Sequence, residues 1–244
     1  LRTICSVDEL KKIEVINFDG WVANYLRNKG YEYRIIYDEE LQELWDDAIN
    51  FAGADLGFKN SFFLEEWSKV VCAQEAFSKD KYITATRVGR GTGLDRKLRL
   101  EVWKVFEEYK TLLNEKKVRD VELAMYECKS LVKEEVYRYI VVDEGQDFNS
   151  AAFRLIRKLA GEQKINDIFI AADTHQRIYK YRTTLSKCGI NIKGRSKRLK
   201  INYRTTEEIR KAAFGVLKGE KFDDMDMSYD EGEVAQSLTH GEKP

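Results

Sequence analysis

The chain has 244 residues, of which 43% are hydrophobic and 34% are charged, so it can bury the core of one large domain or of two smaller ones. Its 42 basic and 42 acidic residues cancel, and the net charge therefore indicates neither a nucleic acid nor a membrane as partner. No apolar stretch approaches the roughly 20 residues of a membrane span, and the first residues lack the core of a signal peptide. We expect a cytoplasmic protein without a membrane partner.

The four cysteines are widely spaced and form no Cys-x-x-Cys pair, and the chain has only two histidines. This inventory does not suit a zinc site, and reduced thiols in the cytoplasm explain it most simply. The first residue is Leu1 rather than Met, which leads us to expect an internal fragment of a longer protein.

Residues 1–30 are typical of a short α/β unit, and residues 31–38 follow it. The apolar run Ile13–Phe18 predicts a strand. Asp19 is a suitable N-cap for the helix that follows, and Gly30 is placed to end that helix. The alternation in Tyr31–Tyr37 predicts a second strand.

Apolar residues at helical spacing predict a mostly helical segment from about residue 39 to residue 134. The predicted helices are Glu39–Phe51, Ser61–Ala73, Leu94–Lys116 and Val121–Val132. Their aromatic stripes favour a packed core over a binding surface, because an apolar stripe on a helix usually faces the protein interior.

The loop 87–93 between these helices is rich in glycine and basic residues. A phosphate-binding P-loop needs Gly-x-x-x-x-Gly-Lys followed by Ser or Thr, and this pattern occurs nowhere in the chain. We therefore expect a flexible connection, with Arg87 and Arg90 on DNA phosphates, rather than a nucleotide site.

The apolar, β-branched run Tyr137–Val142 ends in two adjacent carboxylates, Asp143 and Glu144. Such a run is typical of a strand buried on both faces of a parallel sheet, and ligands of such sheets bind where the strands end. Two acids at that edge suit a hydrated Mg²⁺ and a water-activating base. An ordinary acidic turn explains the same residues equally well, so the strand end alone does not decide between the two.

Strand and helix alternate after this point. A helix over about residues 149–160, closed by Gly161, precedes the strand Asp167–Ala172. This β-α-β order predicts a right-handed parallel crossover, so Asp173 should lie at the same sheet edge as Asp143.

Between residues 193 and 204 the chain is basic and contains no acid. A DNA contact or domain linker and a solvated loop are equal alternatives for this run. A predicted strand, Leu199–Tyr203, leads into a helix that should open with the capping box Thr205–Glu208. The acidic segment 220–233 is expected to be irregular.

Three motifs stand in one order along the second half of the chain. They are Val141–Asp147, Ala172–Arg182 and Leu199–Thr205. Together they resemble motifs II, III and IV of the UvrD/Rep-like superfamily 1 DNA helicases. The segment Val15–Trp21 resembles a divergent form of the stretch that precedes these motifs, with Asp19 where a histidine is usual.

The resemblance implies an α/β fold, namely a partial RecA-like (P-loop NTPase) parallel sheet with a mostly helical inserted subdomain. Residues 1–32 and 134–195 would form an incomplete first RecA-like ATPase domain that lacks the P-loop. Residues 33–133 would form the helical insertion, and residues 196–244 would begin a second RecA-like domain.

The resemblance also implies roles in an ATP site. Asp143 would hold Mg²⁺, and Glu144 would orient and deprotonate the attacking water. Gln146 would link the nucleotide state to the neighbouring strands.

Residues of the later motifs would complete the site and contact DNA. Gln176 would hydrogen-bond the γ-phosphate or the attacking water, Arg204 would bring a positive charge to it, and Tyr203 would stack on the adenine. Tyr179 and Tyr181 would stack on bases of single-stranded DNA, with Arg182 beside them on the DNA or at the domain interface. Ordinary core or cleft packing remains the alternative for the three tyrosines.

The implied function is that of a DNA-repair type helicase fragment that uses ATP and Mg²⁺ to move 3′ to 5′ on single-stranded DNA or at duplex/single-strand junctions. It would act with the remainder of the helicase chain. Because the Gly-Lys-Thr loop and motifs V and VI are missing, these 244 residues alone should bind ATP poorly and lack ATPase activity. The alternatives are a non-catalytic nucleic-acid-binding or regulatory module, part of a helicase–nuclease fusion, and a parent that acts on RNA.

Overall fold

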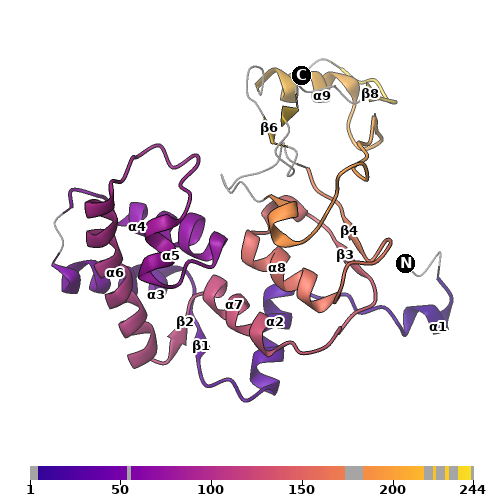
Figure 1. Cartoon of the computed structure of the whole chain (residues 1–244). Helices are drawn as coiled ribbons and strands as arrows, with labels where there is room; N and C mark the ends of the chain where they lie inside the picture. The colour runs from indigo at the N-terminus through magenta and orange to yellow at the C-terminus, as the bar shows by residue number, and fades with distance from the viewer. Residues whose placement is uncertain are drawn as a thin grey trace. The chain divides into compact units, whose positions relative to one another are not determined.

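The computed structural model describes residues 5–53, 56–173, 184–216, 222–223, 229–230 and 236–242 (Figure 1). The chain divides into two compact units, Leu1–Lys133 and Glu134–Pro244, which we call the first and second units. Helices and short, mostly parallel strand pairs occur together, so the protein is of mixed α/β type. Within the described residues, no helix is both long and apolar enough to cross a membrane.

The first unit is mainly helical. Its helices are α1 (Val7–Leu10), α2 (Phe18–Asn28), α3 (Asp38–Ala52), α4 (Asn60–Glu66), the π-helix η1 (Trp67–Cys72), α5 (Lys79–Thr84), α6 (Arg96–Glu115) and α7 (Val121–Leu131). Its strands, β1 (Arg34–Ile35) and β2 (Val118–Arg119), pair in parallel. The four helices predicted between residues 39 and 134 are confirmed, whereas the predicted strand Tyr31–Tyr37 shrinks to the two residues of β1.

The start of the first unit differs from the prediction. Residues 13–17 form no strand, because no other strand pairs with them within the described part of the chain. Asn17, not Asp19, is the N-cap of α2, and its side chain accepts a hydrogen bond from Gly20 N at 3.0 Å. Gly30 follows the end of α2 with a φ of +72°, as the sequence predicts.

Aromatic side chains from α3, η1 and α6 form the core of the first unit. Trp45 stacks on Tyr109 with ring centroids 3.8 Å apart, and Trp67 and Phe106 meet Trp45 edge-on. All four rings are almost completely buried. The prediction that the aromatic stripes form a core is therefore confirmed.

The π-helix η1 was not predicted from the sequence. Two of its residues, Trp67 and Ser68, donate hydrogen bonds to carboxylates of the segment at the start of α7. Asp120, the N-cap of α7, is buried and accepts hydrogen bonds from Trp67 Nε1 at 3.0 Å and from the Tyr109 hydroxyl at 2.9 Å. Ser68 of the same π-turn donates to Glu122 at 2.8 Å. Burial, together with the nearby Asp120 carboxylate, raises the pKa of Glu122 to about 7.

The glycine-rich loop is held by an internal ion pair and does not present its arginines to a ligand. Glu66 is fully buried and binds Arg87 Nε at 2.5 Å and Arg90 Nε at 2.9 Å. The two arginine side chains are only 6% and 7% exposed. The prediction that Arg87 and Arg90 contact DNA phosphates is therefore wrong, because a buried carboxylate already occupies both guanidinium groups.

The second unit contains a parallel strand pair with a crossover helix (Figure 1). Its elements are β3 (Ile140–Val142), η2 (Gly145–Asp147), α8 (Ser150–Leu159), β4 (Ile168–Ile170), η4 (Leu185–Cys188), β5 (Ile201–Asn202), α9 (Glu207–Val216), β6 (Phe222–Asp223), β7 (Tyr229–Asp230) and β8 (Gln236–Ser237). In β3 and β4, Val141 pairs with Phe169, so the predicted parallel crossover is confirmed.

The same strand pair corrects one prediction about burial. Val142 is buried, but Val141 is 73% exposed and its partner Phe169 is 64% exposed. Residues that pair across a parallel ladder lie on the same face, so one face of the pair is open to solvent. The expectation of a strand buried on both faces is wrong for this structure.

The end of the described chain forms a second parallel pair, between β5 and β8, with α9 packed beside it. Hydrogen bonds from Arg210 and then from Ser237 N, at 2.9 Å, lower the pKa of Glu207 to about 2. A hydrogen bond from Gly241 N at 2.8 Å is the main cause that lowers the pKa of Glu208 to about 2. The predicted capping box Thr205–Glu208 is therefore wrong, because α9 begins at Glu207 and both glutamates bind the β8 segment instead. In the acidic segment 220–233, β6 and β7 pair in antiparallel fashion.

Candidate functional site

Two carboxylates follow β3 directly. Asp143 and Glu144 are both exposed, and Asp143 Oδ1 accepts a hydrogen bond from Glu144 N at 3.0 Å. Glu144 has a φ of +51°, a left-handed conformation that few residues other than glycine adopt. The turn thus places two acidic side chains next to each other at the carboxyl end of the strand, as the sequence predicts.

Gln146 joins this turn to the end of β4. Its side chain is buried, its Nε2 donates to Glu144 Oε2 at 2.6 Å, and its Oε1 accepts from Asp173 N at 2.9 Å. The Gln146 amide therefore connects the carboxylate of Glu144 to the backbone of Asp173, which lies 27 positions after Gln146. With both ends bound to protein groups, Gln146 can hold Glu144 in place.

The ends of β3 and β4 approach each other so closely that position 145 has no room for a side chain. The N–H of Gly145 donates to the carbonyl of Ala171 at 2.8 Å, continuing the ladder beyond β3 and β4. A Cβ at this position would lie 2.6 Å from Cγ2 of Ile170, a distance that real Cβ contacts do not show. We assigned Gly145 no role from the sequence, although its place between the acidic pair and Gln146 is the signal that points to it.

The next predicted site residues cannot be placed. Gln176, Tyr179, Tyr181 and Arg182 lie in residues 174–183, outside the described part of the chain. Of the second resembling motif, only its start is described, and Asp173 binds Gln146 there. The predicted approach of Asp173 to the Asp143 edge is confirmed by this hydrogen bond.

The third resembling motif forms a tight turn after β5. Asn202 Oδ1 accepts from Arg204 N at 2.9 Å, and its Nδ2 donates to Thr205 Oγ1 at 2.6 Å. This turn leaves the Tyr203 side chain 74% exposed and Arg204 exposed as well. No contact among the described residues joins Tyr203 or Arg204 to the carboxylates after β3.

The donor set after β3 fits Mg²⁺ in the form in which nucleotide-binding proteins hold it. Mg²⁺ prefers oxygen ligands and usually takes one or two carboxylates, keeping waters and phosphate oxygens in its other positions. The exposed carboxylates of Asp143 and Glu144 meet that requirement. Within the described ranges, no group of three or more His, Cys, Asp or Glu residues is arranged so that it could hold a metal ion.

The fold and site define an α/β protein with an acidic site at the carboxyl edge of a parallel strand pair. Residues 7–192 match the UvrD/REP helicase N-terminal domain. This match covers well over half of the chain, and the protein therefore belongs to the UvrD/REP helicase family. No curated protein matches the chain.

Proposed function

We propose that the chain supplies the hydrolytic half of the ATP site of a DNA helicase that moves 3′ to 5′ on single-stranded DNA. The observation that carries this proposal is the Gln146 bridge, which ties Glu144 to the start of the second resembling motif. An acidic turn without function would not need a buried amide to fix one of its carboxylates, because exposed carboxylates are satisfied by water.

In this proposal each group after β3 has a separate task. Glu144 orients and deprotonates the water that attacks the γ-phosphate, and Gln146 is a positioning residue that fixes the Glu144 carboxylate. Asp143 would hold Mg²⁺, which when bound neutralises charge on the phosphate oxygens. Because Gln146 also binds Asp173 N, a shift of the β4 end would move the base.

The remaining assignments follow from the family. Gln176 senses the γ-phosphate, Arg204 brings it a positive charge, and Tyr203 stacks on the adenine. The exposure of Tyr203 and Arg204 supports these two roles, because both side chains are accessible to a ligand. Single-stranded DNA would stack on Tyr179 and Tyr181, beside Arg182.

The domain organisation is part of the same proposal. Residues 1–32 and 134–195 would belong to a first RecA-like domain, residues 33–133 to a helical insertion, and residues 196–244 to a second RecA-like domain. The open face at Val141 and Phe169 supports an incomplete sheet, because parallel sheets are normally covered on both faces.

The general-base assignment can be tested in a protein that carries this chain together with a Gly-Lys-Thr/Ser loop. Glu144→Gln should reduce the rate of ATP hydrolysis by at least about 100-fold, because general bases contribute about 10²–10⁴-fold, and should leave ATP binding largely intact. Glu162→Gln, an exposed carboxylate in the same unit without an assigned role, is the control. Turnover of Glu144→Gln within about tenfold of the unmodified protein would show that Glu144 is not the base.

The 244-residue chain alone should show no significant ATPase activity, because it lacks the lysine and backbone amides that hold the β- and γ-phosphates. A coupled assay with and without single-stranded DNA measures this directly. Robust DNA-stimulated turnover would contradict the expectation.

The absence of a Gly-Lys-Thr/Ser loop from these residues also favours a second candidate, a nucleic-acid-binding or regulatory module without ATPase activity. The two candidates differ in one measurement on the protein that carries this chain. A helicase would bind ATP with Mg²⁺ and hydrolyse it in the presence of DNA, whereas the module would bind nucleic acid without turnover.

A further inference from the structure

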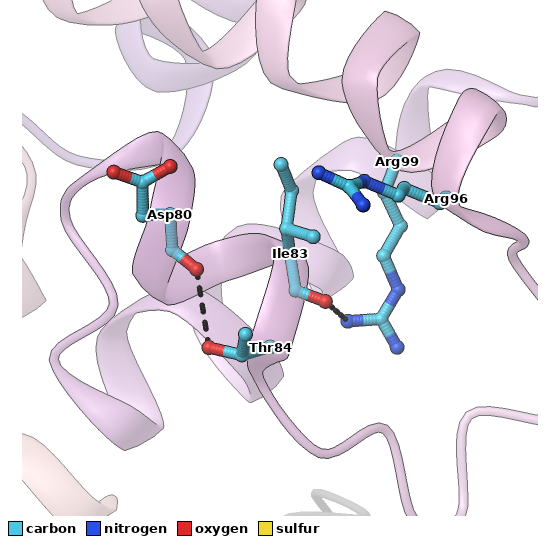
Figure 2. Close-up of a pocket in the computed structure, with 5 residues that line it drawn as sticks. All are labelled: Asp80, Ile83, Thr84, Arg96 and Arg99. Carbon is cyan, nitrogen blue, oxygen red and sulfur yellow. Dashed lines mark hydrogen bonds between the residues drawn. The ribbon is translucent and has the colours of Figure 1, made fainter.

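A pocket lies in the first unit between the end of α5 and the start of α6 (Figure 2). It is lined by Asp80, Ile83, Thr84, Arg96 and Arg99 and has a volume of about 420 Å³. Figure 2 shows Arg96 and Arg99 on one side of Ile83, with Asp80 and Thr84 on the other. Neither the family match nor the proposed ATP site accounts for this pocket.

Arg99 is held rigidly at the pocket by one edge of its guanidinium group. Its Nη1 donates to the carbonyls of Ile83 and Ala85, both at 2.8 Å, which caps the last turn of α5. Among the described residues, Nε and Nη2 of Arg99 have no hydrogen-bond partner. The group is therefore fixed in orientation and still has donors to offer.

Arg96 precedes Arg99 by three residues on α6, so both side chains lie on the same side of this helix. Arg96 is exposed, and within the described chain it forms no ion pair. The start of α6 already carries one carboxylate, because Asp95 is its N-cap and Asp95 Oδ1 accepts a hydrogen bond from Leu98 N at 2.7 Å. Arg96 and Arg99 therefore bring two positive charges to the pocket, whereas Asp80 is the one carboxylate in its lining.

The segment that surrounds the pocket carries an excess of positive charge, which also favours an anionic ligand. The segment 79–99 contains seven basic residues and two acidic ones. Glu66 pairs with both Arg87 and Arg90, and Glu65 also pairs with Arg90, whereas Lys79, Lys81 and Lys97 are exposed and form no ion pair in the described structure. Asp80 stands in the first turn of α5, where a carboxylate stabilises the helix itself.

We propose that this pocket binds a phosphate group, with Arg96 and Arg99 as its ligands. The planar guanidinium fork matches phosphate oxygens, and one arginine is already fixed in orientation by α5. The phosphate can belong to a nucleic-acid backbone or to a free anion, and both present the same oxygens. The inference does not depend on the proposed ATPase activity.

The first test titrates the 244-residue chain with inorganic phosphate and follows the arginine Nε–H signals by NMR. We expect saturable shifts of the Arg96 and Arg99 signals that sodium chloride at the same ionic strength does not produce. Arg96→Glu should abolish the shift at Arg99. Lys97→Glu is the matched control, because it makes the same charge change in the same helical turn but does not line the pocket.

The second test separates the two sources of phosphate by fluorescence anisotropy with single-stranded and duplex DNA. If the pocket holds a backbone phosphate, Arg96→Glu should weaken DNA binding at least fivefold more than Lys97→Glu. It should also reduce the slope of log K against log salt by about 0.7–0.9, the value for one lost phosphate contact. Phosphate-induced shifts with unchanged DNA binding would support a site for a free anion instead.

Arg99→Lys keeps the charge but loses the planar fork, and it should weaken phosphate binding while the circular dichroism spectrum stays unchanged. If Arg99→Lys unfolds the chain, the comparison of Arg96→Glu with Lys97→Glu still tests whether the pocket binds phosphate, because both of these residues are exposed. Equal effects of these two variants, or no shift of either arginine signal with phosphate, would overturn the proposal.

Discussion

The two units of the chain use their apolar and charged residues in opposite ways. In the first unit, Trp45 is 1% exposed and is surrounded by other aromatic rings. In the second unit, the strand pair that carries the candidate site leaves Phe169 64% exposed. The first unit thus completes a core with its own residues, whereas the strand pair of the second unit does not.

The carboxylates differ in the same way. Glu66 in the first unit is completely buried and bound by two arginines, while Asp143 and Glu144 in the second unit face solvent. A carboxylate that is buried and paired with two arginines is inaccessible to a substrate, but an exposed carboxylate at a strand end can meet one. The comparison therefore separates the residues that build the protein from those that we propose act on a ligand.

The largest effect should come from the aromatic core. Trp45→Ala should lower the free energy of unfolding by about 3–5 kcal/mol, because a large buried ring leaves a cavity. Phe169→Ala in the open strand pair should change it by no more than about 0.5 kcal/mol. Urea unfolding followed by circular dichroism measures both, and similar losses for the two variants would show that the face at Phe169 is covered in solution.

The second largest effect on stability should come from the buried ion pairs of Glu66 with Arg87 and Arg90. Glu66→Gln should cost about 3 kcal/mol, because it leaves Arg87 buried without a counter-charge and Arg90 with Glu65 as its one remaining ion-pair partner in the described structure. Glu65→Gln, where the side chain is 51% exposed, should cost less than about 1 kcal/mol. All four tryptophans lie in the first unit, so tryptophan fluorescence during urea unfolding reports this unit alone. Equal costs for the two variants would mean that water reaches Glu66.

A smaller effect is expected where the two strand ends meet. Gly145→Ala should destabilise the second unit by about 1–3 kcal/mol, because the added methyl group overlaps the side chain of Ile170. Gly93→Ala is the control, since a Cβ there meets nothing within 4 Å. Hydrogen exchange of the Gly145 and Ala171 amides, both bonded across the pair, measures the difference. Unchanged protection in Gly145→Ala would contradict the close approach.

The last effect depends on pH. Glu122 has a pKa of about 7 in the folded chain against an ordinary value of 4.5. The folded state therefore binds the proton more tightly, so its stability should fall as pH rises from about 4.5 to 7 and level off above that. Glu122→Gln should gain stability relative to the unmodified chain over this range, measured by urea unfolding at pH 4.5, 6 and 8.

Glu115→Gln is the matched control for this experiment, because Glu115 is exposed at the end of α6. The difference in free energy of unfolding between Glu115→Gln and the unmodified chain should be the same at all three pH values. If the free energy of unfolding of Glu122→Gln has the same pH dependence as that of the unmodified chain, Glu122 is ionised in the folded chain at neutral pH. Water would then reach the Glu122 carboxyl.

Local sequence patterns were sufficient to predict the long helices and the parallel crossover. The apolar spacing in α3, α6 and α7 predicted these helices to within two residues at each end. The order of β3, α8 and β4 predicted their parallel pairing, because only a crossover helix can connect neighbouring parallel strands. The acidic pair at the end of β3 and its approach to Asp173 followed from the same reasoning.

Predictions failed where the partner of a residue is distant in the sequence. The apolar run Ile13–Phe18 has the composition of a strand, but a strand needs a neighbour to bond its backbone, and the described structure offers it none. Arg87 and Arg90 were predicted to contact DNA phosphates, but both guanidinium groups bind Glu66, which lies more than 20 residues earlier in the sequence.

The sequence by itself determined the family of this protein, its helical segments and the acidic strand end, because these depend on residue types at short, regular spacing. Only the tertiary structure decided which charged groups are already satisfied and which are available to a ligand. Burial and pairing are set by residues that folding brings together, as Glu66 meets Arg87 and Gln146 meets Asp173. For that reason the arginines of the glycine-rich loop are already paired with Glu66, whereas Arg96 and Arg99 line a pocket at which we propose that phosphate binds.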